Sequence, residues 1–215
     1  MEEIDNPFRK AGLLLLVIGI ADIALMLYCI VNKIDYSSSF NLFAVIAGAL
    51  LLKGGVKTAR VVRWFSAFSV IAFLAMVFLF PIFMPIELLL TQVKLDPVGI
   101  LGSYAFSLAF ICLLGWIYSQ LSRPRALAKL AKAGYNTGKP NSALYAALGT
   151  MVVVGVMFGL LFNSESATKA KALAKEQLGS NYEYHVSSLS VTGNNGSAVV
   201  TAYNSREIKD VHVKW

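Results

Sequence analysis

The sequence has few charged residues, and this scarcity is the first guide to its class. Only 14% of the 215 residues are charged, whereas 57% are hydrophobic. A soluble domain carries about a quarter charged residues. Because the apolar residues also gather in long runs instead of alternating with polar ones, we predict an integral membrane protein.

Residue types that bind metals or act as nucleophiles are also scarce. The chain has two cysteines, Cys29 and Cys112, both inside apolar runs, and two histidines, His185 and His212. Neither pair has the spacing of a metal site, and no nucleophile motif or phosphate-binding loop is present. We therefore predict a non-enzymatic protein with no catalytic, cofactor-binding or metal-binding residues.

The formal net charge of +7 would suggest nucleic acid in a soluble protein. Here the basic residues crowd into short loops beside the apolar runs, and no aromatic and basic platform for single strands is present. The expected partner of these residues is the lipid bilayer, and we expect no nucleic acid.

The apolar runs predict an all-α polytopic membrane bundle over residues 1–163. The five predicted spans are 11–32, 40–55, 61–80, 98–121 and 143–162. The second span is short and crosses only if Lys53 extends to the interface and the bilayer thins. Pro81 and Pro85 are expected to break or kink the third span, after which an apolar continuation covers 82–92.

The distribution of basic loops predicts the orientation. With five spans, the Arg9–Lys10 pair and the basic loops after the second and fourth spans fall on one side. The positive-inside rule then places the N-terminus in the cytoplasm and the C-terminus outside. Short, strongly asymmetric loops suggest a bacterial inner membrane, with a periplasmic C-terminus.

Residues 164–215 predict a separate small α+β extracytoplasmic domain, formed by a helix and a three-stranded antiparallel meander. Ser164 and Glu165 can cap the helix, which is expected to end at Gly179. The three strands follow, with a bulge expected at Ser187–Ser188 of the first. A domain this small is marginally stable alone, and its open edge strand suits a protein partner.

Two carboxylates in the apolar part are candidate intramembrane polar sites. Asp22 lies near the centre of the first span, where an ionised group costs several kcal/mol unless it is paired, protonated or solvated. Either it serves a conduction path or it is a buried hydrogen-bonding group at a helix contact, and the lack of ionisable partners on the other spans favours the second. Glu87, after Pro85, is expected near the outer headgroups.

Small residues recur every four positions on the last two spans and predict helix packing, because small faces allow close approach. They are Gly99, Ser103, Ser107 and Gly115 on the fourth span, and Gly155 and Gly159 on the fifth. This packing can be within the chain or between subunits.

The loop after the fourth span predicts a short basic helix on the cytoplasmic face. Its candidate contacts with lipid or a cytosolic partner are Arg123, Arg125, Lys129 and Lys132. Attraction to anionic headgroups accounts for this composition without a protein partner.

Together these features favour an accessory membrane subunit that oligomerises or joins a larger membrane complex and presents its C-terminal domain to an extracytoplasmic partner. A second hypothesis is a small channel or proton-coupled transporter that uses Asp22. A third is a membrane-state sensor that signals through the basic loop 122–142.

Overall fold

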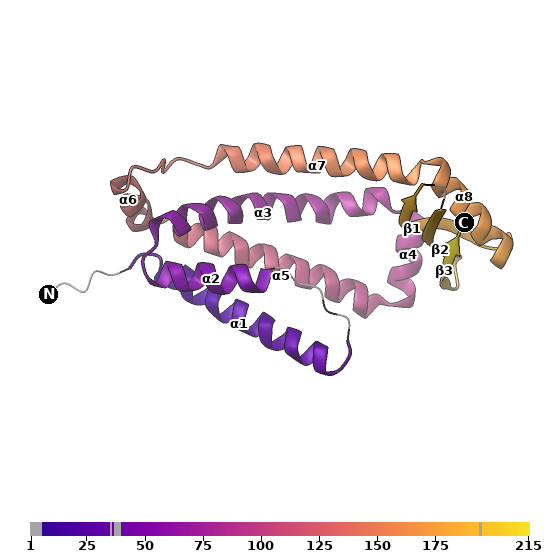
Figure 1. The fold of residues 1–215 in the computed structure, drawn as a ribbon, viewed down its shortest axis with the longest axis horizontal. Coiled ribbons are helices and arrows are strands. Elements are labelled where there is room, and N and C mark those ends of the chain that lie inside the picture. The colour runs from indigo at the N-terminus through magenta and orange to yellow at the C-terminus, as the bar shows by residue number, and fades with distance from the viewer. Residues whose placement is uncertain (1–5, 35, 37–39, 194) are drawn as a thin grey trace. The chain divides into compact units, whose positions relative to one another are not determined.

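The computed structural model describes residues 6–34, 36, 40–193 and 195–215. It is mostly helical and ends in a three-stranded antiparallel sheet (Figure 1). The helices are α1 (Arg9–Val31), α2 (Phe40–Leu52), α3 (Val56–Phe83), α4 (Ile86–Leu95), α5 (Pro97–Leu121), α6 (Pro124–Lys132), α7 (Asn141–Phe162) and α8 (Glu165–Leu178). The strands are β1 (Glu183–Thr192), β2 (Asn195–Tyr203) and β3 (Ile208–Lys214).

Among the described residues, four helices are long and apolar enough to cross a membrane. They are α1, the Val56–Leu79 part of α3, α5 and α7. At 1.5 Å per residue, a helix of 23 residues such as α1 is about 35 Å long, which exceeds a hydrocarbon core of about 30 Å. The second predicted span forms α2, whose 13 residues reach only about 20 Å.

The third predicted span differs from expectation at its end. Pro81 lies inside α3, and the helix continues to Phe83 before it stops. The break comes at Met84 and Pro85, because a residue that precedes proline is disfavoured in the helical conformation. The apolar continuation then forms the separate helix α4.

The chain folds as two compact units, and α3, α5 and α7 each contribute to both. One contains residues 1–71 and 111–146, and the other contains residues 72–110 and 147–215. The core of the first unit is built from one face of α1, α2 and α6 with the start of α3 and the end of α5.

In the first unit, α1 and α2 form a close antiparallel pair. A Cβ placed on Gly48 would lie 2.7 Å from the backbone nitrogen of Leu16 and 2.8 Å from the carbonyl oxygen of Gly12. Real Cβ contacts are never that short, so glycine at position 48 lets the two backbones touch. The side-chain amide of Asn6 then donates to the carbonyl oxygens of Leu51 and Leu52, at 2.8 and 2.9 Å. Thus α2 ends beside the start of α1.

In the second unit, α8 packs on one face of the sheet, whose strand order is β1-β2-β3 (Figure 1). Ser164 caps α8 by accepting from the backbone N–H of Ala167 at 3.2 Å. The fully buried residues of α8 are all alanine, which lets the helix lie close to the valines of the strands, and Leu173 and Leu178 pack at the edge of this core. The register shifts between Val186 and Ser188, so the predicted bulge is confirmed.

Candidate functional site

Asp22 of α1 is hydrogen-bonded to a residue that follows the same helix. The phenol of Tyr36 donates to its carboxylate, and lies 3.3 Å from its backbone carbonyl oxygen. Both side chains are half-buried. This partner comes from the segment that joins α1 to α2. One feature of the sequence could have indicated this contact, since Tyr36 is the one tyrosine between Val31 and the start of α2.

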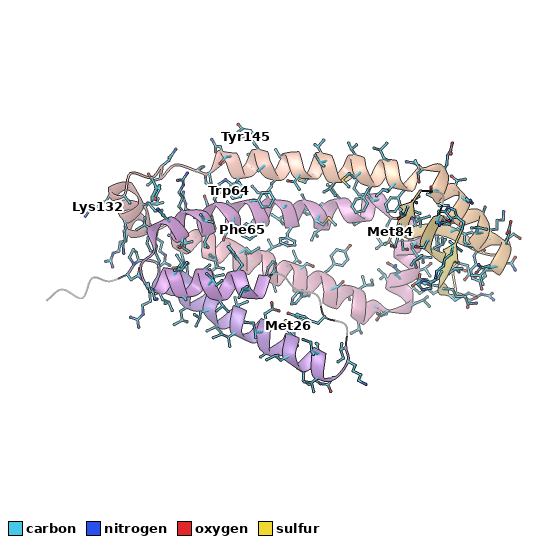
Figure 2. The ribbon with its side chains drawn as sticks, viewed as in Figure 1. Met26, Trp64, Phe65, Met84, Lys132 and Tyr145 are labelled. Atoms are coloured by element: carbon cyan, nitrogen blue, oxygen red, sulfur yellow. The ribbon has the colours of Figure 1, made fainter. Side chains whose placement is uncertain are left out.

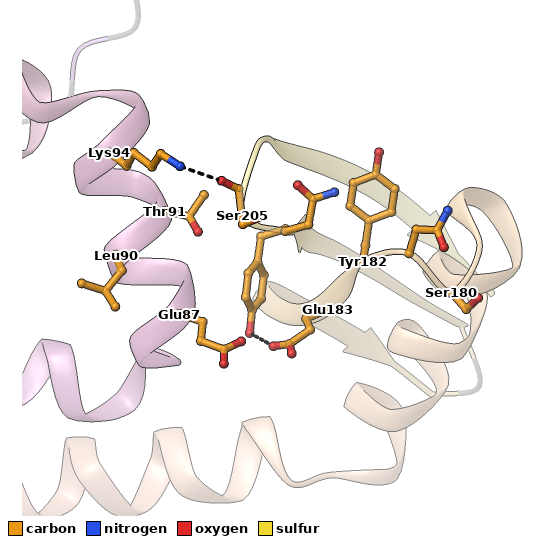
Figure 3. A pocket seen from close by; sticks show the side chains of 11 residues that line it. Glu87, Leu90, Thr91, Lys94, Ser180, Tyr182, Glu183 and Ser205 are labelled. Carbon is orange, nitrogen blue, oxygen red and sulfur yellow. Dashed lines mark hydrogen bonds between the residues drawn. The ribbon is translucent and has the colours of Figure 1, made fainter.

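A polar pocket of about 580 Å³ lies in the second unit, between α4 and the sheet. Figure 3 shows Glu87 of α4 and Glu183 of β1 extending into the same part of this pocket. Glu87 is exposed in the first turn of α4, where a carboxylate interacts favourably with the helix dipole. Sequence analysis singled out Glu87 but not Glu183, because the two residues are far apart in the sequence and no local pattern links them.

Tyr203 lies beside the two carboxylates and is hydrogen-bonded to one of them. Its buried hydroxyl donates to the carboxylate of Glu183 at 2.7 Å. Burial raises the pKa of Tyr203 first, and the hydrogen bond from its hydroxyl to Glu183 and the negative charges of Glu183 and Glu87 raise it further. Tyr203 therefore remains a neutral donor at physiological pH.

A second tyrosine, Tyr182, fixes the rim of the pocket. Its hydroxyl donates to Glu207 and accepts from the ammonium of Lys209 at 2.8 Å, and Lys209 also pairs with Glu207 at 3.0 Å. The hydrogen bond from Tyr182, followed by that from Lys209, lowers the pKa of Glu207. These side chains order the rim but leave the carboxylates of Glu87 and Glu183 facing the pocket.

The other end of the α4 wall carries a cation. Lys94 at the end of α4 donates to the carbonyl oxygen of Ser205 at 3.4 Å (Figure 3). The lining therefore combines two carboxylates and one ammonium with neutral hydroxyl and amide groups, and it carries a net negative charge. Such a lining suits a cationic group that also carries hydrogen-bond donors.

The small residues of α5 are exposed or half-buried. Gly99 and Ser103 are exposed, and Ser107 and Gly115 are half-buried. Among the described residues, nothing lies within 4 Å of a Cβ placed on Gly115. The hydroxyls of Ser103 and Ser107 donate to carbonyl oxygens one turn earlier in α5 itself.

The small residues of α7 are in part covered within the chain. Ala143 and Ala147 at the start of the same face are buried. A Cβ on Gly155 would meet the ring of Phe83 at 3.6 Å, an ordinary contact, whereas a Cβ on Gly159 would meet nothing described within 4 Å. The closest helix contact is thus the Gly12–Gly48 pair, which the search for repeated small residues missed.

The basic residues after α5 belong to the short helix α6 and its N-cap. Ala126 and Leu130 are buried on its inner face, whereas Arg123, Arg125 and Lys132 are exposed. Lys129 is half-buried, with its ammonium 5.2 Å from the centre of the Phe8 ring. The four residues therefore do not act as one surface.

Arg63 of α3 holds the segment after α6 and was not singled out in the sequence. It is only 7% exposed, and its guanidinium donates to the Ser122 hydroxyl at 3.1 Å and to the carbonyls of Thr137 and Gly138 at 3.2 and 2.9 Å. The neighbouring Trp64, labelled in Figure 2, donates to the hydroxyl of Ser142 at 2.9 Å. Both basic loops therefore lie at the same end of the first unit.

In the part of the chain that the structure describes, no group of three or more histidine, cysteine, aspartate or glutamate side chains could hold a metal ion. Comparison with family models, with curated proteins and with solved structures found no match for this chain.

Proposed function

We propose that this chain is a non-enzymatic subunit of a bacterial inner membrane complex, and that its C-terminal module binds a partner outside the membrane. The module consists of α8 and the three strands, with α4 forming the far wall of its pocket. The four long apolar helices fit an integral membrane protein.

The contacts of the basic end support one orientation. Asn6 links the start of α1 to the end of α2, and Arg63 links the start of α3 to the segment after α6. Four chain segments rich in lysine and arginine are therefore neighbours within one unit. On the positive-inside rule this end is cytoplasmic, so α7 leads out to a periplasmic C-terminus.

The position of the short helix α2 supports a return of the chain to the cytoplasmic side of the membrane. Since α2 ends beside the start of α1, the α1–α2 pair leads the chain back to the cytoplasmic end whether or not α2 crosses the whole core. The Tyr36 hydroxyl near Asp22 also supports a structural role for this carboxylate, because a non-helical segment at membrane depth needs such internal hydrogen bonds. We therefore propose packing, and not conduction, for Asp22.

The pocket between α4 and the sheet is the observation that carries the proposed binding role. Two carboxylates face a space of about 580 Å³ whose rim is ordered by hydrogen bonds. A lysine or arginine side chain from an extracytoplasmic protein would meet Glu87 and Glu183 there. The pairing would be partly shielded from salt because Tyr203 at the base is buried.

Site-specific photocrosslinking in native membranes tests this role. A photoreactive residue at Ser180, which lines the pocket, should give a defined adduct, and one at Glu176 on the exposed side of α8 should not. Replacing Glu87 and Glu183 by glutamine should reduce the Ser180 adduct. Equal adducts from both positions, or an adduct indifferent to the glutamines, would contradict the proposed binding site.

Association through α5 is a second part of the proposal. The stripe of Gly99, Ser103 and Ser107 would let a neighbouring helix of the complex approach closely. In a background with Cys29→Ala and Cys112→Ala, a cysteine at Ser103 should crosslink to a neighbouring subunit. A cysteine at Ala105, exposed on the opposite side of α5, is the matched control.

A further inference from the structure

A second hollow, in the first unit, has a different chemistry from the acidic pocket. This basic groove has a volume of about 840 Å³ and is formed by the start of α1, the end of α5 and the start of α6. Arg9, Lys10 and Arg123 line it, with Arg125 beside them. None of the described residues that line it carries a carboxylate.

The start of α6 adds to the positive potential of the basic groove. This helix begins at Pro124 without a side-chain cap and without an acidic residue in its first turn. Its first backbone N–H groups and its dipole therefore favour an anion at Arg123 and Ala126, which line the groove.

A polar side chain in the wall of the groove is also available to a ligand. Gln120 is only 5% exposed and lines the groove near the end of α5. Among the residues that the structure describes, its side-chain amide has no hydrogen-bond partner. Since none of the described residues has a buried side-chain polar atom without a partner, this amide is accessible from the groove and can donate to a ligand there.

The remaining wall of the groove is apolar and belongs to the long helices. Leu13 of α1 is 54% exposed and Trp116 of α5 is 41% exposed, and Leu14 also lines the groove. Tryptophan is enriched at the level of lipid headgroups, because one part of the ring is apolar and the other donates a hydrogen bond. The groove thus changes from cationic to apolar along the helices.

We propose that the basic groove binds one anionic phospholipid. The phosphate of the headgroup accepts hydrogen bonds from Arg9, Arg123 and the Gln120 amide, and Lys10 contributes charge. An acyl chain lies along Leu13 and Trp116. This inference rests on the membrane insertion proposed above, but not on the partner of the C-terminal module.

Native mass spectrometry of the full-length protein in detergent tests the groove. Phosphatidylglycerol and phosphatidylcholine are titrated separately, and the fraction of protein with one bound lipid is read. We expect phosphatidylglycerol to bind more tightly. The double variant Arg9→Ala, Arg123→Ala should weaken its binding by roughly five-fold for each residue removed.

Gln120→Leu supplies a test that leaves the charge unchanged. It should weaken phosphatidylglycerol binding several-fold while the melting temperature in detergent is retained. Lys132→Ala is the matched control, since Lys132 is an exposed residue at the end of α6 (labelled in Figure 2) and does not line the groove. Equal binding by wild type and all variants, or an equal loss in Lys132→Ala, would overturn the assignment.

Inorganic phosphate distinguishes a lipid from a soluble anion. Millimolar phosphate should leave the bound phosphatidylglycerol in place, because the acyl chain adds contacts that phosphate lacks. Displacement at that concentration would assign the groove to a soluble anion and overturn the lipid. Crosslinking at Ser180 is independent of all these results, so failure of the groove and failure of the proposed partner binding can be told apart.

Discussion

Tyr36 and Asp22 form a contact whose contribution can be isolated at the scale of single residues. Tyr36→Phe removes the hydroxyl that donates to the carboxylate of Asp22. Because a typical intramolecular hydrogen bond contributes about 0.5–1.5 kcal/mol, we expect a loss of that order in stability. Thermal unfolding in detergent measures the loss.

A double-mutant cycle with Asp22→Asn shows whether the two residues act together. If they do, the cost of Tyr36→Phe should shrink when Asp22 is already replaced. Tyr28→Phe, at an exposed position of α1, is the control for loss of a hydroxyl and should have little effect. Strictly additive costs would contradict the contact.

His185 predicts a pH dependence of the C-terminal module. Burial beside Phe162, followed by the charge of Lys171, lowers the pKa of His185 below its ordinary value of 6.5. A lowered pKa means that folding favours the neutral ring, so its contribution is complete above about pH 6.5 and is lost as the pH falls through the lowered pKa. Trp215 fluorescence during unfolding at pH 7.5 and at pH 5 reports this loss.

His185→Gln should remove much of that pH dependence, because glutamine does not titrate. His212→Gln, at an exposed position of β3, should leave it in place. If the two variants show the same pH profile as the wild type, His185 is not its origin.

At the scale of elements, the α1–α2 contact predicts that alanine has opposite effects on stability at two glycines. Gly48→Ala should destabilise the protein by about 1–3 kcal/mol, because its Cβ would press on the backbone of α1. Gly159→Ala should be neutral or stabilising by up to about 1 kcal/mol, since nothing described lies near its Cβ and alanine is the better helix former. Melting curves in detergent compare the two, and equal shifts would contradict the contact.

The long helices and the sheet could be predicted from patterns within each segment. Length and hydropathy identified α1, α5 and α7, and alternation with a turn signal identified the strands. The end of α3 was placed about three residues too early, because a break or kink was expected at both Pro81 and Pro85, whereas the helix continued past Pro81 to Phe83 and stopped before Pro85.

The contacts between segments could not be predicted in the same way. Gly48 is one glycine in a short apolar helix, and only the position of α1 shows why a side chain cannot be present there. Likewise, Glu87 and Glu183 meet in one pocket although nearly a hundred positions separate them. Patterns in one segment report its own burial, but they do not report which other segment it faces.

At the scale of the whole molecule, the central claim is that the basic end and the C-terminal module lie on opposite sides of a membrane. Lys132 and Arg206 are exposed and represent the two ends. With Cys29→Ala and Cys112→Ala as background, a cysteine can be placed at either position and labelled with a membrane-impermeant maleimide in intact spheroplasts.

Labelling before and after the spheroplasts are opened is the most direct measurement. The proposed topology predicts labelling of Arg206→Cys in intact spheroplasts, labelling of Lys132→Cys only after opening, and retention of the protein in alkali-washed membranes. Equal labelling of both positions in intact spheroplasts, or release of the protein by alkali, would contradict it.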